Sequence, residues 1–381
     1  MLRDKIDPRT YKIRGALVDA GQPVTEFVRL DAYHPMFGRY ASPSATRPYR
    51  FYYDGRAYEF LLRHLELPSV ASYARFSMRL AREGFRVLHC NSVTEHLSAG
   101  MIRWGRLPVV TEVYDVTSLY EVTNIRTLFT REGRLVKGPR KWMLDHVIRN
   151  VLRWERVAHE QAAGLVYTSR LMLDHVRAKY AVSCPSLVIP NAVYGKLLPR
   201  DRIPDKLSAT EGGLHLVYTG VIRDSGTGHH RDICDQLNQI SQGEVITHLY
   251  PIIPEPERDR VVKRLRANKR IRWHEPLPYQ ELYRELSRYD AGLVILAPHD
   301  APLLELALPN KIFEYVAVGL PVLVSPYKPL LEFIRMYQCG EALNGQDTVA
   351  SFHPRKVPFR EEFAIEYYIP DLIRLYDAVG R

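Results

Sequence analysis

The chain has 381 residues, of which 46% are hydrophobic and 25% charged, with 22 glycines and 26 prolines. This is the composition of a globular protein, and it excludes extended disorder, collagen-like repeats and a disulfide scaffold. The length favours two domains. No run of about 18 apolar residues occurs, so no membrane span is predicted, and the polar start MLRDKIDPRTYK predicts no signal peptide.

The positive charge is concentrated in one half of the chain. Residues 1–192 hold 29 basic and 18 acidic side chains, a net charge of +11, whereas the remainder has a net charge of −1. Such asymmetry is typical of a surface that meets phosphate, on a nucleic acid or an anionic lipid. The four cysteines are far apart and lack C-x-x-C spacing, which favours a reducing cytosol and argues against a zinc ribbon.

In the first half, short β-branched runs alternate with amphipathic stretches, which predicts an α/β domain with a parallel sheet. Asp7 and Pro8 have the residue types of a helix cap and first helical position, and Gly21 is expected to end that helix. The pattern then predicts strands at 24–30, 87–90, 109–113, 166–168 and 187–190, and helices at 71–83, 93–103, 142–161 and 170–180.

The second half repeats this alternation after a stretch at 193–213 that is rich in proline, glycine and charge and is predicted to be a linker. A last helix is predicted from Phe359 to Val379. Between them the pattern predicts strands at 214–218, 247–251, 271–274, 292–297 and 322–325, and helices at 233–240, 258–268, 279–286 and 310–318.

The start of the chain departs from the pattern of an open parallel domain. Such a domain begins with a central strand whose end leads into the first helix. Only the six residues MLRDKI precede Asp7, and they are too few and too polar for a buried strand. We therefore predict that the first strand is missing, with a shortened N-terminus as the hypothesis that explains it.

The segment LPNKIFEYVAVGLPVLVS, residues 308–325, has the most specific pattern. Pro309 is predicted to start a helix and Gly319 to end it. A helix N-terminus offers unpaired N–H groups and partial positive charge, which suits a diphosphate, and Lys311 adds a full charge. Glu314, one turn further in, has the geometry to accept two hydrogen bonds from a ribose diol. The alternative is an ordinary helix with a solvated glutamate.

This segment resembles the signature P-x-K-x-x-E-Y-x-A-x-G-x-P-V of the GT-B glycosyltransferases, particularly the family-4-like enzymes. Weaker resemblances follow in the family's order at VLHCNS (87–92), PVVTEVYD (108–115), LVIPNAV (187–193), LVYTGVIRDSG (216–226) and IRWHEPLPYQELYREL (271–286). The resemblance implies two Rossmann-like domains that face each other across a cleft. It implies an acceptor-binding domain at 1–192, a linker at 193–212, a nucleotide-sugar domain at 213–358 and a terminal helix at 359–381 that crosses back to the first domain.

The resemblance also implies roles for residues of the signature. Glu314 would bind the ribose of a nucleotide-sugar, and Asn310 and Lys311 would lie against the diphosphate and sugar. The family usually has a second acid eight residues before this glutamate, where the present chain has Leu306, with Glu305 one residue out of register. This departure leaves both the transferred sugar and the stereochemical outcome open.

A glycine and basic residues after the first strand of the donor domain complete the implied donor site. Gly220 would let the donor approach the backbone, and Arg223 would be the first of two cations that clamp the diphosphate. The lysine that the family usually has as the second cation is absent, which leaves Arg231, His229 or His230. For the two histidines, a place on the surface of the loop is the alternative.

Three residues at strand ends are the candidates on the acceptor side. Asp115 follows a predicted buried strand, where a carboxylate either acts as general base on an acceptor hydroxyl or caps the next turn. His89 and Asn91 end the preceding strand and are predicted to line the acceptor pocket. A hydrogen-bonded core histidine is the alternative for His89.

A basic segment interleaved with bulky apolar residues suits an anionic membrane surface. A solvated loop and a helix packed on its own domain are the alternative. Nucleic acid is not expected, because no aromatic platform or helix-turn-helix spacing accompanies the charge. The predicted membrane-facing residues are Arg126, Arg131, Arg134, Lys137, Arg140 and Lys141.

The resemblance therefore implies a glycosyltransferase that moves a hexose from a nucleotide-diphosphate sugar to a glycan or lipid-linked acceptor, in cell-surface polysaccharide synthesis. We expect a retaining enzyme in the cytoplasm, peripheral at the inner face of the membrane. It would need no cofactor or metal, because the sequence has no D-x-D triplet. A nucleotide-sugar epimerase of the same fold and a non-catalytic GT-B-like subunit are the alternatives.

Overall fold

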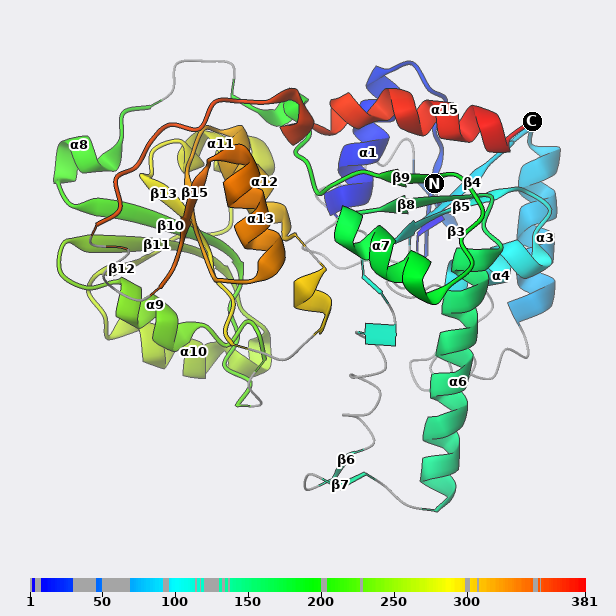
Figure 1. The fold of residues 1–381 in the computed structure, drawn as a ribbon, viewed down its shortest axis with the longest axis horizontal. Helices are drawn as coiled ribbons and strands as arrows, with labels where there is room; N and C mark the ends of the chain where they lie inside the picture. The colour runs from blue at the N-terminus through cyan, green and yellow to red at the C-terminus, as the bar shows by residue number, and fades with distance from the viewer. Residues whose placement is uncertain are drawn as a thin grey trace. The chain divides into compact units, whose positions relative to one another are not determined.

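A computed structural model of the chain shows two compact units, residues 1–190 with 368–381 (unit 1) and residues 191–367 (unit 2). Each unit is built on a parallel sheet with helices on its faces, which confirms the predicted α/β class (Figure 1). The structure describes residues 2–3, 8–29, 46–49, 69–91, 96–113, 115–116, 118–119, 130–131, 134–135, 138–199, 204–226, 229–298, 302–306, 308–344, 349 and 351–381.

The sheet of unit 1 has the strand order β3-β2-β1-β4-β5-β8-β9, and its paired strands are parallel. A short antiparallel hairpin, β6 (Thr130–Arg131) and β7 (Arg134–Leu135), precedes the longest helix. The sheet strands are β1 (Leu2–Arg3), β2 (Glu26–Arg29), β3 (Thr46–Tyr49), β4 (Leu88–Asn91), β5 (Val109–Val113), β8 (Gly164–Tyr167) and β9 (Ser186–Val188). The helices are α1 (Pro8–Asp19), α3 (Ser69–Arg82), α4 (His96–Trp104), α6 (Pro139–Glu160), α7 (Arg170–Lys179) and α15 (Ile369–Val379).

The prediction that the first strand is missing is wrong. β1 lies in the middle of the sheet, where Leu2 is paired in register with Phe27 of β2 on one side and with Cys90 of β4 on the other. Two residues suffice because a central strand finds backbone partners in both neighbours, and this pairing depends on no apolar side-chain pattern. A search for a buried apolar run therefore misses such a strand.

The sheet of unit 2 has the order β12-β11-β10-β13-β14-β15, again with parallel pairs. Its strands are β10 (Leu214–Val221), β11 (Val245–Ile252), β12 (Ile271–Trp273), β13 (Ala291–Val294), β14 (Val322–Val324) and β15 (Gly340–Ala342). The α-helices are α8 (Leu207–Glu211), α9 (Cys234–Ile240), α10 (Arg258–Arg266), α11 (Tyr279–Leu286), α12 (Asn310–Ala317) and α13 (Lys328–Tyr337). Short 3-10 turns are η3 (Gly195–Leu197), η4 (Glu255–Glu257), η5 (Pro302–Glu305), η6 (Glu361–Phe363) and η7 (Ile365–Tyr368).

Unit 2 has apolar packing on both faces of its sheet. One cluster joins the strands to α11, α12 and α13, with Tyr315 and Phe333 inside it. The other joins them to α9 and α10 through Leu237 and Leu265. Figure 1 shows these two helical layers on opposite faces of the sheet. The arrangement explains why strands such as β14, with the sequence VLV, are apolar at every position.

Two predicted segments differ from the structure. The described part of the predicted linker is packed into unit 2: the Val193 N–H donates to Phe363 O at 2.9 Å, and the Leu207 N–H donates to Arg288 O at 2.9 Å. The predicted terminal helix is also shorter, because η6 and η7 precede α15 and Pro370 lies in the first turn of α15, where proline is favoured. This last helix belongs to unit 1.

Candidate functional site

The order of the strands in unit 2 reverses between β10 and β13. In open α/β sheets, ligands bind outside the carboxyl ends of the strands at such a reversal. Helix α12 is fixed beside the end of β10 by Tyr315: the Thr219 N–H donates to the Tyr315 hydroxyl oxygen at 2.9 Å, and Thr219 Oγ1 lies 3.1 Å from the same oxygen. The first turn of α12 is thereby placed at the reversal.

Lys311 on this first turn lies against the end of β10. Its Nζ is 3.5 Å from the centre of the Tyr218 ring, a cation–π contact. The same nitrogen is 3.4 Å from the position that a Cβ at residue 220 would take, and Gly220 has φ of +116°, a conformation that favours glycine. Burial and the charge of Arg231 hold the pKa of Lys311 well below its usual range, and Glu314 opposes this shift. A bound anion would favour the charged amine.

The start of α12 has no side-chain cap. Pro309 is at the N-cap position, and the Asn310 Oδ1 atom is buried without a hydrogen-bond partner. The loop before the helix is held by Asn191, whose Nδ2 donates to the Leu308 carbonyl at 2.8 Å. The first amides of the helix are thus presented without a competing side-chain acceptor, as an anion site requires.

Glu314 lies one turn into α12 and is buried, with 5% of its surface exposed. It is close enough to Lys311 for its charge to raise the pKa of that amine. The carboxylate and the ammonium group thus occupy one region of unit 2. This confirms the predicted helix around Glu314, whereas the predicted contact with a pentose stays a prediction.

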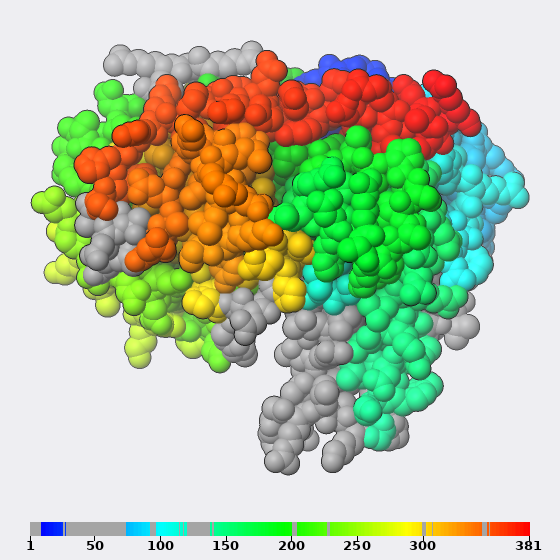
Figure 2. Space-filling view, viewed as in Figure 1, coloured from blue at the N-terminus to red at the C-terminus, as the bar shows by residue number. Residues whose placement is uncertain are grey.

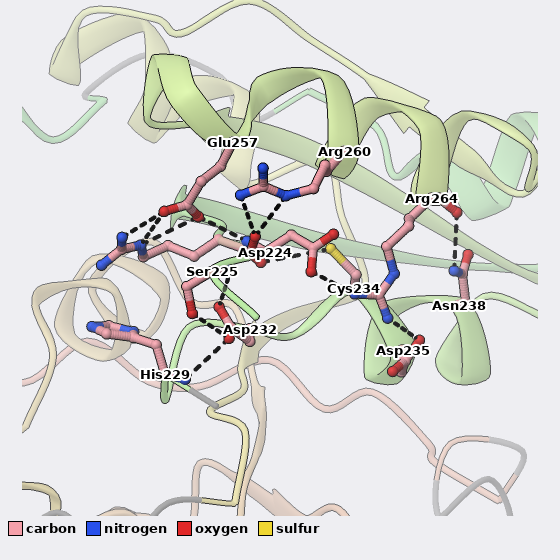
Figure 3. A network of polar contacts seen from close by, with 11 residues as sticks. Asp224, Ser225, His229, Asp232, Cys234, Asp235, Asn238, Glu257, Arg260 and Arg264 are labelled. Atoms are coloured by element: carbon pink, nitrogen blue, oxygen red, sulfur yellow. Dashed lines mark hydrogen bonds and ion pairs between the residues drawn. The ribbon is translucent and has the colours of Figure 1, made fainter. Parts of the chain in front are cut away.

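The loop after β10 is held by a network of charged side chains (Figure 3). Arg223 Nε lies 3.0 Å from Oε1 of Glu257, and the Asp224 N–H donates to Oε2 of the same carboxylate at 2.8 Å. Arg223, predicted to clamp a diphosphate, is therefore paired with an acid. The Arg223 N–H also donates to the Arg231 carbonyl at 2.9 Å, which closes the loop at its base.

Of the candidates for the second cation, Arg231 is the one placed near Lys311. Its side chain is exposed, and its charge helps to lower the pKa of Lys311 and opposes the rise that burial causes in the pKa of Tyr218. The rings of His229 and His230 stack on each other, with centroids 4.1 Å apart. His229 Nδ1 accepts from the Arg231 N–H at 3.1 Å, which fits the alternative of a local role in the loop.

The predicted acceptor residues of unit 1 lie in a buried network. His89 and Asn91 are 3% and 1% exposed. Asn91 Nδ2 donates to Oε2 of Glu112 at 2.7 Å, and His89 Nδ1 lies 2.5 Å from the Tyr376 hydroxyl. Arg9 Nε is 2.5 Å from Glu112 Oε1. This burial favours the alternative for His89, a hydrogen-bonded core histidine, and gives Asn91 the same structural role.

Asp115 directly follows β5 and is half-buried. It interacts with other residues of the chain, and its predicted role as general base stays a prediction.

The basic segment is described only in part. Arg126 and Lys137 lie outside the described residues, while Arg131 and Arg134 are on the hairpin β6–β7. Arg140 and Lys141 are in the first turn of α6, followed by Trp142, which is 65% exposed. This first part of α6 extends away from the sheet of unit 1 (Figure 1).

Across the described ranges, no helix has the length and apolarity to cross a membrane. No group of three or more His, Cys, Asp or Glu in the part of the chain that the structure describes is arranged to hold a metal ion. The absence of a cofactor remains an expectation.

Three residues that shape these sites were not predicted from sequence: Tyr218, Glu257 and Glu112. Tyr218 is in the strand whose end was predicted to contact the donor, and its ring faces Lys311. Glu112 is an acid within an otherwise apolar or neutral strand, VVTEV, which is a signal for a buried ion pair. Glu257 lies in the charged stretch PEPERDR and offers no comparable signal.

Comparison with known proteins supports the resemblance seen in the signature segment. Residues 10–194 match the sequence model of Glycosyltransferase Family 4. No curated protein matches the chain. The structure is similar to WaaG, a glycosyltransferase involved in lipopolysaccharide biosynthesis, with 14% identity and a TM-score of 0.59 over 100% of this chain and 98% of that one.

Two further solved structures have the same fold. HepE (Alr3699) of Anabaena, in complex with UDP and glucose, is 15% identical with a TM-score of 0.57, over 100% of this chain and 92% of that one. Sucrose-phosphate synthase (tll1590) from Thermosynechococcus elongatus is 15% identical with a TM-score of 0.56, over 97% and 85%. The chain has the fold of the GT-B glycosyltransferases, and the predicted resemblance is confirmed.

Proposed function

We propose that this protein with the GT-B fold is a glycosyltransferase that uses a nucleotide-diphosphate sugar as donor and a glycan or lipid-linked acceptor. One observation carries the proposal: Lys311 Nζ lies against Gly220 and the Tyr218 ring, at the first turn of a helix that has no side-chain cap. The charge of Arg231 also acts on Lys311, so two basic side chains serve the strand-order reversal of unit 2. A diphosphate would balance their charge.

The proposed donor pose follows from these positions. The diphosphate would lie on Lys311, Arg231 and the first amides of α12, and would approach the backbone at Gly220, where no side chain intervenes. Glu314 would accept hydrogen bonds from the hydroxyls of the adjoining pentose. Complexes of HepE with UDP-glucose and with UDP support a donor of this class.

The proposed transfer exchanges one bond at the anomeric carbon of the sugar for another. The bond between the anomeric carbon and the diphosphate oxygen breaks, and the acceptor oxygen bonds to that carbon. Positive charge at Lys311 and Arg231 would stabilise the departing diphosphate, in place of a metal ion. With retention of configuration, the departing diphosphate would take the acceptor proton, and with inversion Asp115 would be the base.

Calorimetric titration with a panel of nucleoside diphosphates tests the proposal. We expect one of them to bind and inorganic phosphate to bind far more weakly, because it lacks the pentose that Glu314 would hold. A hydrolysis screen over the corresponding nucleotide-sugars, with analysis of the product anomer, then identifies the sugar and the stereochemistry. Absence of binding by every nucleoside diphosphate would overturn the proposal.

We further propose that unit 1 binds an anionic membrane surface through the outer part of α6. The exposed side chains Lys141, Trp142 and Arg149 lie on one face of this part of the helix, together with the acidic Asp145 and opposite the buried stripe that contains Leu144. The outer part of α6 also stands out from unit 1 in the space-filling view (Figure 2). Each basic side chain near an anionic surface contributes about 1 kcal/mol. This would place the enzyme beside a lipid-linked acceptor used in polysaccharide synthesis.

A further inference from the structure

Arg223 makes a two-pronged ion pair with a nearly buried acid. Its Nε and Nη2 atoms lie 3.0 and 2.5 Å from Oε1 of Glu257, whose side chain is 7% exposed. The hydrogen bonds from Arg223 are the largest cause that lowers the pKa of Glu257 below its ordinary value. The Glu257 carboxylate therefore already compensates the charge of Arg223. A second anion at this guanidinium would be repelled by that carboxylate.

The ion pair is part of a frame that fixes the start of the loop to α10. The Asp224 carbonyl accepts from Arg260 Nη2 at 2.8 Å, and Asp224 Oδ1 lies 2.8 Å from Arg264 Nη1. Arg264 also contacts Asp235 at 2.5 Å. Figure 3 shows Glu257, Arg260 and Arg264 pointing from this side toward the loop. Backbone and side chain of Asp224 are thus both held.

The end of the loop is held by a second acid. Asp232 Oδ2 accepts from Ser225 Oγ at 2.6 Å and from the His229 N–H at 3.0 Å. The backbone bond from the Arg223 N–H to the Arg231 carbonyl joins both ends. The contacts that hold Arg223 therefore also restrain the backbone of Arg231 through this hydrogen bond.

Arg231 differs from Arg223 in its surroundings. It makes no ion pair with a carboxylate among the residues that the structure describes, and its side chain is exposed. It lies on the loop that follows Gly220 at the end of β10, where its carbonyl accepts from the Arg223 N–H, and its charge helps to lower the pKa of Lys311. The cation that the loop presents to a ligand beside Lys311 is Arg231.

We propose that Arg223 is a positioning residue and that Arg231 is the diphosphate ligand of this loop: the Arg223–Glu257 pair sets the loop backbone that presents Arg231. This inference rests on the proposed donor site and departs from the role that the family resemblance implies for Arg223. It makes Glu257, 34 residues further along the chain, a determinant of donor affinity without contact to the donor.

Titration of variants with the nucleoside diphosphate that binds best to the wild type tests the inference. In E257Q, we expect affinity to fall by about 3- to 10-fold, because a charge-assisted bond that fixes the loop is weakened. If Arg223 contacts the diphosphate, the same variant frees its charge and affinity rises. R231Q is expected to lower affinity by about 10-fold or more, because a charged contact to phosphate is lost.

The paired variant R223Q/E257Q provides the decisive comparison. It removes the charge of Arg223 but keeps an amide oxygen at position 257 that can accept from the Asp224 N–H, and it avoids an unpaired buried carboxylate. We expect its affinity to match that of E257Q, because the loop loses the same ion pair in both variants and no contact to the ligand is removed. An affinity well below that of E257Q would show that Arg223 itself contacts the ligand, and it overturns the inference. If R223Q alone fails to fold, the direction in which the affinity of E257Q changes still distinguishes a positioning role of Arg223 from a direct contact.

The exposed pair Glu255–Arg258, 3.8 Å apart in the same stretch, offers a matched control, and E255Q/R258Q should bind like the wild type. The two proposals fail in different ways. If the wild type binds no nucleoside diphosphate, the donor site itself is wrong. If it binds and R231Q binds equally well, only the assignment within the loop is wrong.

Discussion

The hydroxyl of Tyr376 lies 2.5 Å from Nδ1 of His89, so the last helix of the chain is hydrogen-bonded to β4 in unit 1. Burial and the Glu112 charge raise the pKa of Tyr376 well above its usual value, so the hydroxyl keeps its proton and donates it. Nε2 of the same imidazole lies 3.4 Å from Glu112. With hydrogen on Nε2, His89 accepts from Tyr376 at Nδ1, and Nε2 faces the Glu112 carboxylate without forming a hydrogen bond.

Replacement of Tyr376 by Phe removes this donor while the ring stays in place. We expect unit 1 to lose about 1 kcal/mol of unfolding free energy, because His89 Nδ1 is left buried without a partner. Calorimetric unfolding should show the shift in the transition of unit 1. Tyr367, which is 55% exposed in unit 2, is the matched control, and Tyr367→Phe should leave the transition of unit 1 in place.

Three histidines in unit 2 form a hydrogen-bonded row. His215 Nε2 lies 3.0 Å from the Gly212 carbonyl, His215 Nδ1 lies 3.0 Å from His248 Nε2, and His248 Nδ1 lies 2.9 Å from His274 Nε2. A carbonyl only accepts, so His215 carries its hydrogen on Nε2, and each ring then accepts on Nδ1 from the next. Both ring nitrogens of neutral His248 therefore have hydrogen-bond partners.

This row makes the stability of unit 2 depend on pH. Burial, with the charges of His274 and His215, lowers the pKa of His248 to about 3, whereas in the unfolded chain the value is near 6.5. Between these values the unfolded state binds more protons, so stability is lost as the pH falls from about 6.5 to 3. Denaturant titrations at several pH values give the free energy of unfolding as a function of pH. In His248→Gln, the slope of this free energy against pH should fall by the equivalent of up to one bound proton. The exposed His353 is the control, and an unchanged slope in His248→Gln contradicts the assignment.

The fold could be predicted from sequence where a segment has a clear apolar period. The predicted ranges 109–113 and 279–286 coincide with β5 and α11. The terminal helix was predicted too long, because residues 361–368 are amphipathic in sequence but form 3-10 turns against Val193. α13 and β15 were not predicted, since Pro329 and the short GEA strand interrupt any period.

Among the functional residues, contacts between neighbours in the sequence could be predicted, whereas contacts between residues far apart in the sequence could not. Lys311 and Glu314 were predicted because one helical turn brings them together. The partner of Arg9 was not predicted, since Glu112 is 103 residues away and the contact exists only once β5 and α1 are packed. A sequence pattern identifies a charged residue but not the charge that compensates it in the fold.

Glu314→Ala separates the pentose contact from the phosphate contact. We expect the affinity for the nucleoside diphosphate to fall by about 10- to 100-fold, the effect of one or two lost charge-assisted hydrogen bonds. Inorganic pyrophosphate, which lacks the pentose, should lose less affinity, because only the support that the Glu314 charge gives to protonated Lys311 is removed. Glu332 on α13 is a matched control, since it lies in the same unit on another helix. Equal losses for both ligands would mean that Glu314 acts through the fold of the helix.

Lys311→Met should have the opposite pattern. A methionine side chain can occupy the space against the Tyr218 ring, but the charge is removed. We expect the affinities for the nucleoside diphosphate and for pyrophosphate to fall together, by about 10-fold or more, because both carry the phosphates that the ammonium group would contact. Titration calorimetry with the two ligands measures this. The exposed Lys263 on α10 serves as control, and a loss confined to one ligand would show that Lys311 does not bind the phosphates.

The membrane proposal predicts a dependence on both charge and the exposed indole. The wild type should float with vesicles that contain anionic lipid and not with neutral vesicles, and flotation should weaken as salt is raised, because salt screens exposed charges. The triple variant Lys141→Gln, Trp142→Ala, Arg149→Gln should lose flotation without a change in unfolding, since all three side chains are exposed. Arg170→Gln, an exposed basic residue on α7 of the same unit, should float like the wild type. Equal flotation with neutral and anionic vesicles would contradict an electrostatic contact through α6.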